Sequence, residues 1–337
     1  MYRLLLLAAS TLTSTVALGQ PDAGSVATLP IHALRLLPSS PGRIGMDYLG
    51  YEPGTNQVWV PGGLTGRVFV VDANLETIRT IEGFATRQRD GRELGPSSVT
   101  FGPGRAFIGN RADSSVCAVD LRTLQRGECV ALPEAPDGLA YVATTDEVWA
   151  TLPIAKALVI LSAAKAGLPI AGHIELPGEP EGYAVDAARG RFYTNLRDRN
   201  QTLVLDVHKR ATAAHWPTTC SAEGPRGMTL DATGDVLVVA CTDRLLSFAV
   251  NPVPTLLGRL ETGAGLDNID LAPKLGTVFA AAGKAELLTR AELLGGGALS
   301  ATGQAHTASG VQGVVVSAAG KAFAADSAAG QLWVAGP

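Results

Sequence analysis

The sequence predicts an all-β fold, a seven-bladed β-propeller whose blades are four-stranded antiparallel sheets. One observation is a segment that recurs seven times, with steps of 53, 40, 44, 45, 41 and 45 residues. Another is the content of each copy, in which short apolar or β-branched runs alternate with Gly/Asp turns. A third is an apolar run near the N-terminus that belongs to no copy. The copies begin near Gly45, Ser98, Gly138, Gly182, Gly227, Asn268 and Gly313.

The copy that begins at Gly182 shows the strand pattern most clearly. We name the strands of a blade a to d, from the central channel outwards. Strand a is expected at 182–186, strand b at 191–195, strand c at 202–206 and strand d near 213–216. Equivalent runs occupy the other copies, and in the sixth copy strand c is expected at 285–288.

The seventh copy lacks room for a fourth strand, because the chain ends soon after its third apolar run at 331–334. The unassigned run at 31–37 has the character of a strand d. We therefore predict that residues 31–37 form the outer strand of blade 7. This pairing would join the two ends of the chain and leave no open edge between the first and last blades.

The first 19 residues have the features of a secretory signal peptide. Arg3 supplies a positive charge, residues 4–18 carry no charge, and small residues precede a cleavage site after Gly19. We expect residues 20–337 to form one propeller domain, located in the periplasm or secreted. No later apolar run approaches the roughly 18 residues of a membrane span, so a soluble protein without a membrane span is expected, and a monomer. The formal net charge of −4 argues against a nucleic-acid partner.

Four cysteines in an exported chain favour two disulfides. Cys117 falls on strand c of blade 2 and Cys129 on strand d, so the two are neighbours in a hairpin. Cys220 falls in the loop that enters blade 5, and Cys241 ends strand b of that blade, on the same side of the ring. Four buried free thiols or a metal site remain the alternatives.

Two parts of blade 4 resemble the repeat of the YVTN, or YncE-like, propellers. Residues 192–195 read FYTN and residues 203–206 read LVLD, and the runs at 68–72 and 116–120 match the second half of that repeat. The resemblance implies an exported bacterial propeller, in a family mostly without a defined reaction.

Blades 6 and 7 have a weaker similarity to the lactonase-type propellers, such as the gluconolactonase and paraoxonase groups. It is carried by residues 265–270 (GLDNID) and 324–326 (AAD). This second resemblance implies hydrolysis at the centre of the ring.

We expect a ligand at the upper mouth of the channel, where the chain enters strand a and where strand b ends. The upper face is the one that carries the loops between blades and the b–c loops. Asn, Asp and Gly are also common turn residues that bond to their own backbone, and this structural role is the alternative for each position. The polar residues at these places are Asp137, Glu181, Arg226, Asp267, Asn268 and Gln312 at entries to strand a, and Asn110, Asn195 and Asp326 at ends of strand b.

The first functional hypothesis is a binding module for a small anionic ligand or a protein partner, without catalytic residues or a cofactor. The upper loops carry Arg87, Arg89 and Arg197, and guanidinium groups suit carboxylates and phosphates. Interleaved acidic residues make a solvated surface the alternative. Residues 83–95 form a polar insertion between blades 1 and 2, which is the expected partner contact.

The second hypothesis is a calcium-dependent lactonase or related hydrolase. Glu181, Asn268 and Asp326 would supply oxygen ligands to the ion, which could polarise a carbonyl and activate water. The gluconolactonase pattern has an acidic residue at the entry to blade 1. Here the entry reads IGM at residues 44–46, and Asp47 is expected inside the strand.

Overall fold

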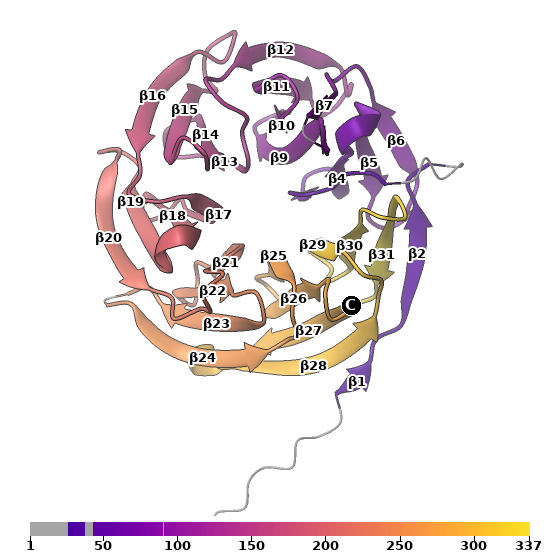
Figure 1. Cartoon of the computed structure of the whole chain (residues 1–337), viewed down its shortest axis with the longest axis vertical. Helices are drawn as coiled ribbons and strands as arrows, with labels where there is room; N and C mark the ends of the chain where they lie inside the picture. Colours follow the sequence, from indigo (N-terminus) through magenta and orange to yellow (C-terminus); the bar gives the residue numbers. More distant parts are fainter. Residues whose placement is uncertain (1–25, 38–42, 90, 252) are drawn as a thin grey trace, which may run out of the picture.

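The computed structural model describes residues 26–37, 43–89, 91–251 and 253–337, with only the backbone at residue 92. The predicted signal peptide at 1–19 lies outside the described residues. Seven antiparallel sheets surround a central channel like the blades of a propeller (Figure 1). The predicted fold class is therefore confirmed.

The strands of each blade follow the chain from the channel outwards. Blade 1 contains β3 (Gly50–Glu52), β4 (Gln57–Pro61), β5 (Val68–Asp72) and β6 (Ile78–Ile81). Blade 2 contains β9 (Pro96–Gly102), β10 (Arg105–Asn110), β11 (Ser115–Asp120) and β12 (Arg126–Ala131). Blade 3 contains β13 (Leu139–Val142), β14 (Glu147–Leu152), β15 (Ala157–Ser162) and β16 (Ile170–Glu175). Blade 4 contains β17 (Pro180–Asp186), β18 (Arg191–Leu196), β19 (Gln201–Asp206) and β20 (Ala211–Pro217).

The remaining blades repeat this order. Blade 5 contains β21 (Met228–Asp231), β22 (Val236–Ala240), β23 (Arg244–Ala249) and β24 (Thr255–Glu261). Blade 6 contains β25 (Leu266–Ala272), β26 (Thr277–Ala282), β27 (Leu287–Leu293) and β28 (Leu299–His306). Blade 7 contains β29 (Val311–Val316), β30 (Ala322–Asp326), β31 (Gln331–Ala335) and β2 (Ile31–Arg35). Short 3₁₀ turns lie at Gly63–Thr65, Arg197–Arg199 and Gly295–Gly297.

The N-terminal part of the chain completes the last blade. Strand β2 pairs antiparallel with β31, with Ile31 opposite Ala335 and Arg35 opposite Gln331. The predicted closure is confirmed, although the strand ends at Arg35 and not at residue 37. Before it, β1 (Ala27–Thr28) pairs parallel with β28 and adds a short fifth strand to blade 6.

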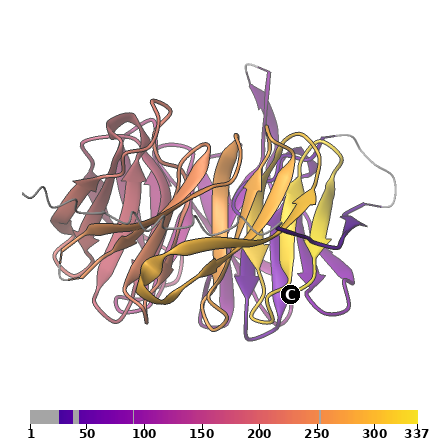
Figure 2. The same ribbon diagram turned by 90° about the horizontal axis from the view of Figure 1, so that it is seen from below.

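Three local expectations are corrected by the structure. Strand a of blade 1 begins at Gly50 and not near Gly45, because Ile44 and Tyr48 donate backbone hydrogen bonds to the neighbouring blades 7 and 2. The insertion at 83–95 is not only a loop. It contains the hairpin β7 (Arg87–Arg89) and β8 (Arg92–Leu94), which rises above the ring (Figure 2). Strand c of blade 6 starts two residues later than expected, at Leu287.

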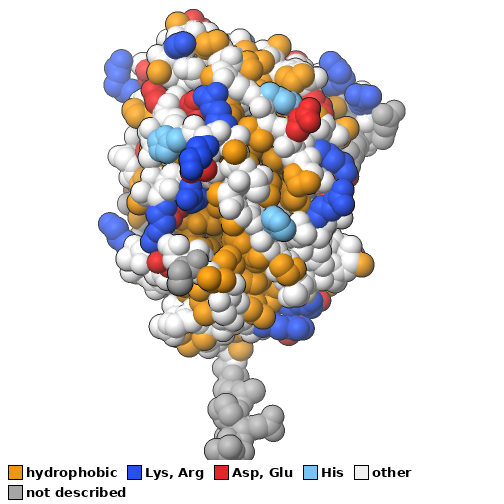
Figure 3. Space-filling view, turned by 90° about the vertical axis from the view of Figure 1, so that its left-hand side faces the viewer, with side chains coloured by type: hydrophobic (Ala, Val, Ile, Leu, Met, Phe, Trp, Pro, Cys, Tyr) orange, Lys and Arg blue, Asp and Glu red, His pale blue; other side chains and the backbone are white. Residues whose placement is uncertain are grey.

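The core lies between neighbouring blades and is built mainly of small aliphatic side chains. Every residue of the b strands β4, β14 and β22 is buried. Trp59 and Trp149 are fully buried, as expected for side chains that pack between blades. The outer strands are mostly exposed, and on the side that carries β16 and β20 charged side chains of both signs are interspersed with apolar ones (Figure 3).

Both predicted disulfides are present. Cys117 is bonded to Cys129 and Cys220 to Cys241. Two disulfides indicate an oxidising environment of the extracellular type. Within the described residues there is no helix of the length and apolar character needed to cross a membrane.

Removing residues 26–37 should expose the edge of β31 and open the ring. We expect the truncated protein to melt at a lower temperature and to aggregate, because an unpaired edge strand can pair with another chain. Circular dichroism melts and size-exclusion chromatography measure both effects. A synthetic peptide of residues 26–37 should restore the melting temperature, and a truncated protein as stable as the full chain would show that closure does not stabilise the ring.

Replacing each cystine with serine should lower the free energy of unfolding by about 3 kcal/mol, because the crosslink restricts the unfolded chain. The two bonds close loops of similar size, with sequence separations of 12 and 21 residues. Urea denaturation of Cys117→Ser/Cys129→Ser and Cys220→Ser/Cys241→Ser checks this. Losses well below 1 kcal/mol in both variants would contradict the expectation.

Candidate functional site

Charged side chains from successive blade entries and upper loops meet at the channel. Arg111 donates hydrogen bonds to Asp47, at 2.5 Å, and to Asp137. Arg197 donates to Glu181 Oε2 at 3.3 Å, and Arg226 lies 4.0 Å from the same oxygen. We call this set the charged ring; its members are Asp47, Arg111, Asp137, Glu181, Arg197, Arg226 and Asp267.

Tyr48 crosses the channel at the level of this ring. It comes from the entry to blade 1, but its hydroxyl donates to Asp137 Oδ2 at 3.2 Å in the entry to blade 3. The same hydroxyl accepts the Gly182 N–H of blade 4, also at 3.2 Å. Its aromatic ring stacks on Tyr183, with centroids 5.8 Å apart. The hydroxyl therefore both donates and accepts a hydrogen bond on the far side of the channel.

Three carboxyl groups of the ring, those of Asp47, Glu181 and Asp267, bind protons more tightly than usual. Burial raises the pKa of Glu181 to about 8, and the negative charges of Asp137 and Asp267 add to this effect. Burial and the charge of Asp47 raise the pKa of Asp267 to about 7. Burial also raises the pKa of Asp47, against the effect of Arg111. The ring holds four carboxyl groups and three guanidinium groups, so it has an excess of acidic groups.

Glycine is required where the inner strands come closest together. A Cβ atom at Gly138 would lie 2.3 Å from a ring atom of Tyr183. Gly182 has a φ of +68°, and a Cβ atom there would lie 2.6 Å from the carbonyl oxygen of Arg226. The recurring Gly at the start of the repeat therefore has a packing role at the inner rim of the channel.

Some residues predicted to bind a ligand instead bond within or between blades. Asn110 donates to the Ala85 carbonyl at 3.0 Å. Asn195 accepts the Thr202 hydroxyl at 2.8 Å and donates to the Arg226 carbonyl. Both side chains are buried at the ends of strand b. These contacts match the structural role considered as the alternative from the sequence.

The three residues suggested as calcium ligands do not come together in a way that suits a metal ion. Asp326 accepts hydrogen bonds from Gln331 Nε2 at 3.0 Å and from Trp333 Nε1 at 3.2 Å, inside blade 7. Glu181 faces the arginines of the charged ring, and Asn268 points its amide at Asp47, 3.5 Å away. Among the described residues, no group of three or more His, Cys, Asp or Glu could hold a metal ion.

Three other predicted positions lie at the upper face but outside the charged ring. Gln312 is exposed at the entry to β29. Arg87 and Arg89 are exposed on the hairpin that rises above the ring (Figure 2). Arg197 belongs to the ring, but it is already paired with Glu179 Oε2 at 2.9 Å as well as with Glu181.

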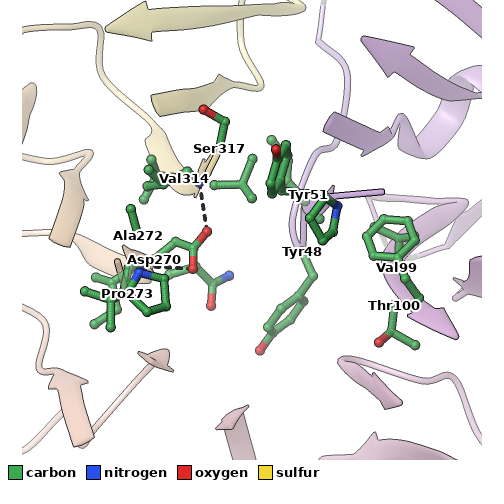
Figure 4. A pocket seen from close by; sticks show the side chains of 18 of the residues that line it. Tyr48, Tyr51, Val99, Thr100, Asp270, Ala272, Pro273, Val314 and Ser317 are labelled. Atoms are coloured by element: carbon green, nitrogen blue, oxygen red, sulfur yellow. Dashed lines mark hydrogen bonds between the residues drawn. The ribbon is translucent and has the colours of Figure 1, made fainter. Parts of the chain in front are cut away.

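A cavity of about 660 Å³ occupies the channel below Tyr48 (Figure 4). Its upper end is formed by Asp47, Tyr48 and Asn268, and its lower end by a–b turns of blades 1, 5, 6 and 7. Six blades line it, with mostly apolar side chains between these ends. The turn residues at the lower mouth are Pro53, Thr233, Pro273, Lys274, Ser317 and Ala318.

The sequence did not reveal this cavity or two members of the upper site. The sequence predicts Asp47 inside strand a of blade 1, but that strand begins at Gly50. Tyr48 is the residue that follows Asp47. The sequence signal that could have identified these two residues is an Asp-Tyr pair shortly before the Gly at which strand a starts. The cavity has no comparable signal, because its walls come from short segments of six separate blades.

No family model matches the chain, and no curated protein matches it. Similar solved structures include a chain of the mitotic checkpoint complex, with 14% identity and a TM-score of 0.75 over 99% of both chains. The WD40 repeats of RRP9 align with 10% identity and a TM-score of 0.73, over 92% of this chain and 98% of that one. A chain of the Kuenenia stuttgartiensis hydrazine synthase aligns with 12% identity and a TM-score of 0.69, over 94% and 98%. These likenesses show a seven-bladed propeller with WD40-like neighbours.

The stability of the protein should fall as the pH rises from about 5 to 9. The native state keeps protons on Glu181 and Asp267 that the unfolded chain releases, so raising the pH favours unfolding. The variant Glu181→Gln/Asp267→Asn should show a weaker decline in melting temperature over this range. Glu261→Gln, at an exposed pair on β24, is the control and should behave as the wild type. Parallel curves for wild type and double variant would contradict the assignment.

Proposed function

We propose that this protein is an exported, non-catalytic binding module that takes a small molecule into its central channel. The observation that carries the proposal is the cavity of about 660 Å³. Its volume lies within the roughly 300–1,000 Å³ of small-molecule sites, and mostly apolar walls with a few polar groups are typical of them.

The ligand enters, in this proposal, from the lower mouth and not from the upper mouth favoured by the sequence. At the upper mouth, Arg111 and Arg197 are paired with carboxylates of the ring and its neighbour Glu179. An anionic ligand there would compete with these carboxylates for the guanidinium groups. The lower mouth is lined by turns whose side chains include the exposed Thr233, Lys274 and Ala318.

Export and family are also part of the proposal. The two disulfides support a periplasmic or secreted location. The YVTN-like runs at 192–195 and 203–206 fall on β18 and β19, as strands b and c of one blade, which supports a YncE-like propeller. A protein partner for the hairpin at 87–94 stays a prediction.

The calcium-dependent lactonase is not proposed as a second function. Glu181 faces two guanidinium groups, and Asp326 is bonded within blade 7. A calcium ion prefers six to eight oxygen ligands, and these residues do not provide a converging set. We derive no reaction step through a metal ion.

Blocking the lower mouth should abolish binding, while a similar change at the upper mouth should not. Thr233→Trp/Ala318→Trp places two large side chains on exposed lower turns, and Gln312→Trp is the matched change above. The probes are a panel of amines, carboxylic acids, sugars and alcohols, with binding detected as a rise in melting temperature. Compounds that stabilise the wild type should still stabilise Gln312→Trp but not the double variant.

The opposite pattern would place the ligand at the upper mouth. Turnover of any member of an ester and lactone panel, lost in the double variant, would overturn the proposal that the channel has no catalytic role. A wild type that no probe class stabilises would also count against a small-molecule site.

A further inference from the structure

One carboxyl group lies in the channel below the charged ring. Asp270, on β25 of blade 6, lines the cavity together with Val314 and Ser317 of blade 7 (Figure 4). One of its oxygens accepts the Val316 N–H at 2.8 Å, and the other accepts the Leu271 N–H at 2.8 Å. Each oxygen keeps a second lone pair for another donor.

Asp270 has no cationic partner in the part of the chain that the structure describes. None of the ion pairs there involves it, in contrast to Asp47 and Asp137, which share Arg111. Burial raises the pKa of Asp270 to about 6, and the two backbone N–H groups only partly oppose that rise. A carboxylate removed from water without a counter-charge is costly, and a cation in the cavity would offset that cost.

The walls around Asp270 suit an apolar body. Tyr48, Tyr51, Phe101 and Tyr183 line the same cavity, and aromatic faces attract ammonium groups as well as apolar groups. Aliphatic side chains fill much of the remaining wall. The only basic side chain among the lining residues is Lys274, which is exposed on the lower turn of blade 6.

We propose that the ligand of the channel is an organic amine, whose ammonium group donates a hydrogen bond to the Asp270 carboxylate while its apolar body lies among the aromatic side chains. This inference rests on the proposed binding function and adds the chemical class of the ligand. It concerns the cavity below Tyr48, whose upper end includes Asp47, and it assigns the contact with the ammonium group to Asp270 and not to the charged ring.

If Asp270 had only a structural role, the charge of its side chain would not affect ligand binding. The bond to Val316 joins β25 to β29 and thus blade 6 to blade 7. Asn at this position keeps one oxygen that can accept the Val316 N–H, but it loses the charge and the acceptor for the Leu271 N–H. If the negative charge of Asp270 serves only to bind the ligand, the Asp270→Asn protein should therefore keep its fold.

The test uses two fluorescent probes with the same apolar body. Dansylcadaverine carries a primary ammonium group, and N-pentyl dansylamide has the same naphthalene body and chain length without it. Fluorescence titration should show that the wild type binds the amine at least about tenfold more tightly than the neutral probe. In Asp270→Asn the amine should bind only as tightly as the neutral probe, whose own affinity should not change. Asp113→Asn, an exposed aspartate on an upper loop, is the matched control and should bind both probes as the wild type does.

The outcomes separate this inference from the function on which it rests. If the wild type binds both probes equally, or if Asp270→Asn keeps the preference for the amine, the amine class is wrong and the channel site stands. If amine binding persists after Thr233→Trp/Ala318→Trp, the probe lies outside the channel and both proposals fail. Failure of both probes to bind the wild type would likewise overturn both. A melting temperature of Asp270→Asn near that of the wild type confirms that lost binding reflects the missing charge.

Discussion

The pairing of β2 with β31 is the constraint on which the rest of the molecule depends. Each blade buries its two faces only against its neighbours, so the first and last blades need each other as much as any adjacent pair. The backbone hydrogen bonds between residues 31–35 and 331–335 hold the first described residues of the chain to the last. With the ring closed, seven inner strands have fixed positions around one axis. The charged ring and the cavity exist only because these strands are held at that spacing.

Much of this architecture was predictable because it depends on local patterns. The number of repeats gives the number of blades. The missing strand of the last repeat and the unassigned strand before the first repeat predict that the two ends of the chain complete one blade together. The disulfides followed from the same register, since Cys117 and Cys129 face each other on paired strands. The site was harder to predict. The structure brings Asp137, Glu181, Arg226 and Asp267 together at entries to strand a, whereas Asn110, Asn195 and Asp326 bond within the sheets or to neighbouring loops, as turn residues often do.

The cavity could not be read from the sequence for a physical reason. Its walls are short segments from six blades, and the distances between these segments are set by the diameter of the ring and by how far each inner strand leans into it. The repeat gives the number of blades, but it does not tell how far each inner strand leans toward the axis. The electrostatic character of the site has the same origin, because the raised pKa values of Glu181 and Asp267 come from burial beside carboxyl groups of other blades.

Tyr48 has a consequence for how any occupant would move. Since its side chain reaches from blade 1 to blades 3 and 4, it divides the axis of the ring into an upper and a lower compartment. An occupant of the lower compartment that moves toward the upper face meets Tyr48 and then the charged side chains beyond it, whereas the a–b turns offer it a route to the lower face. Its dwell time would then depend on which of these two routes is the faster.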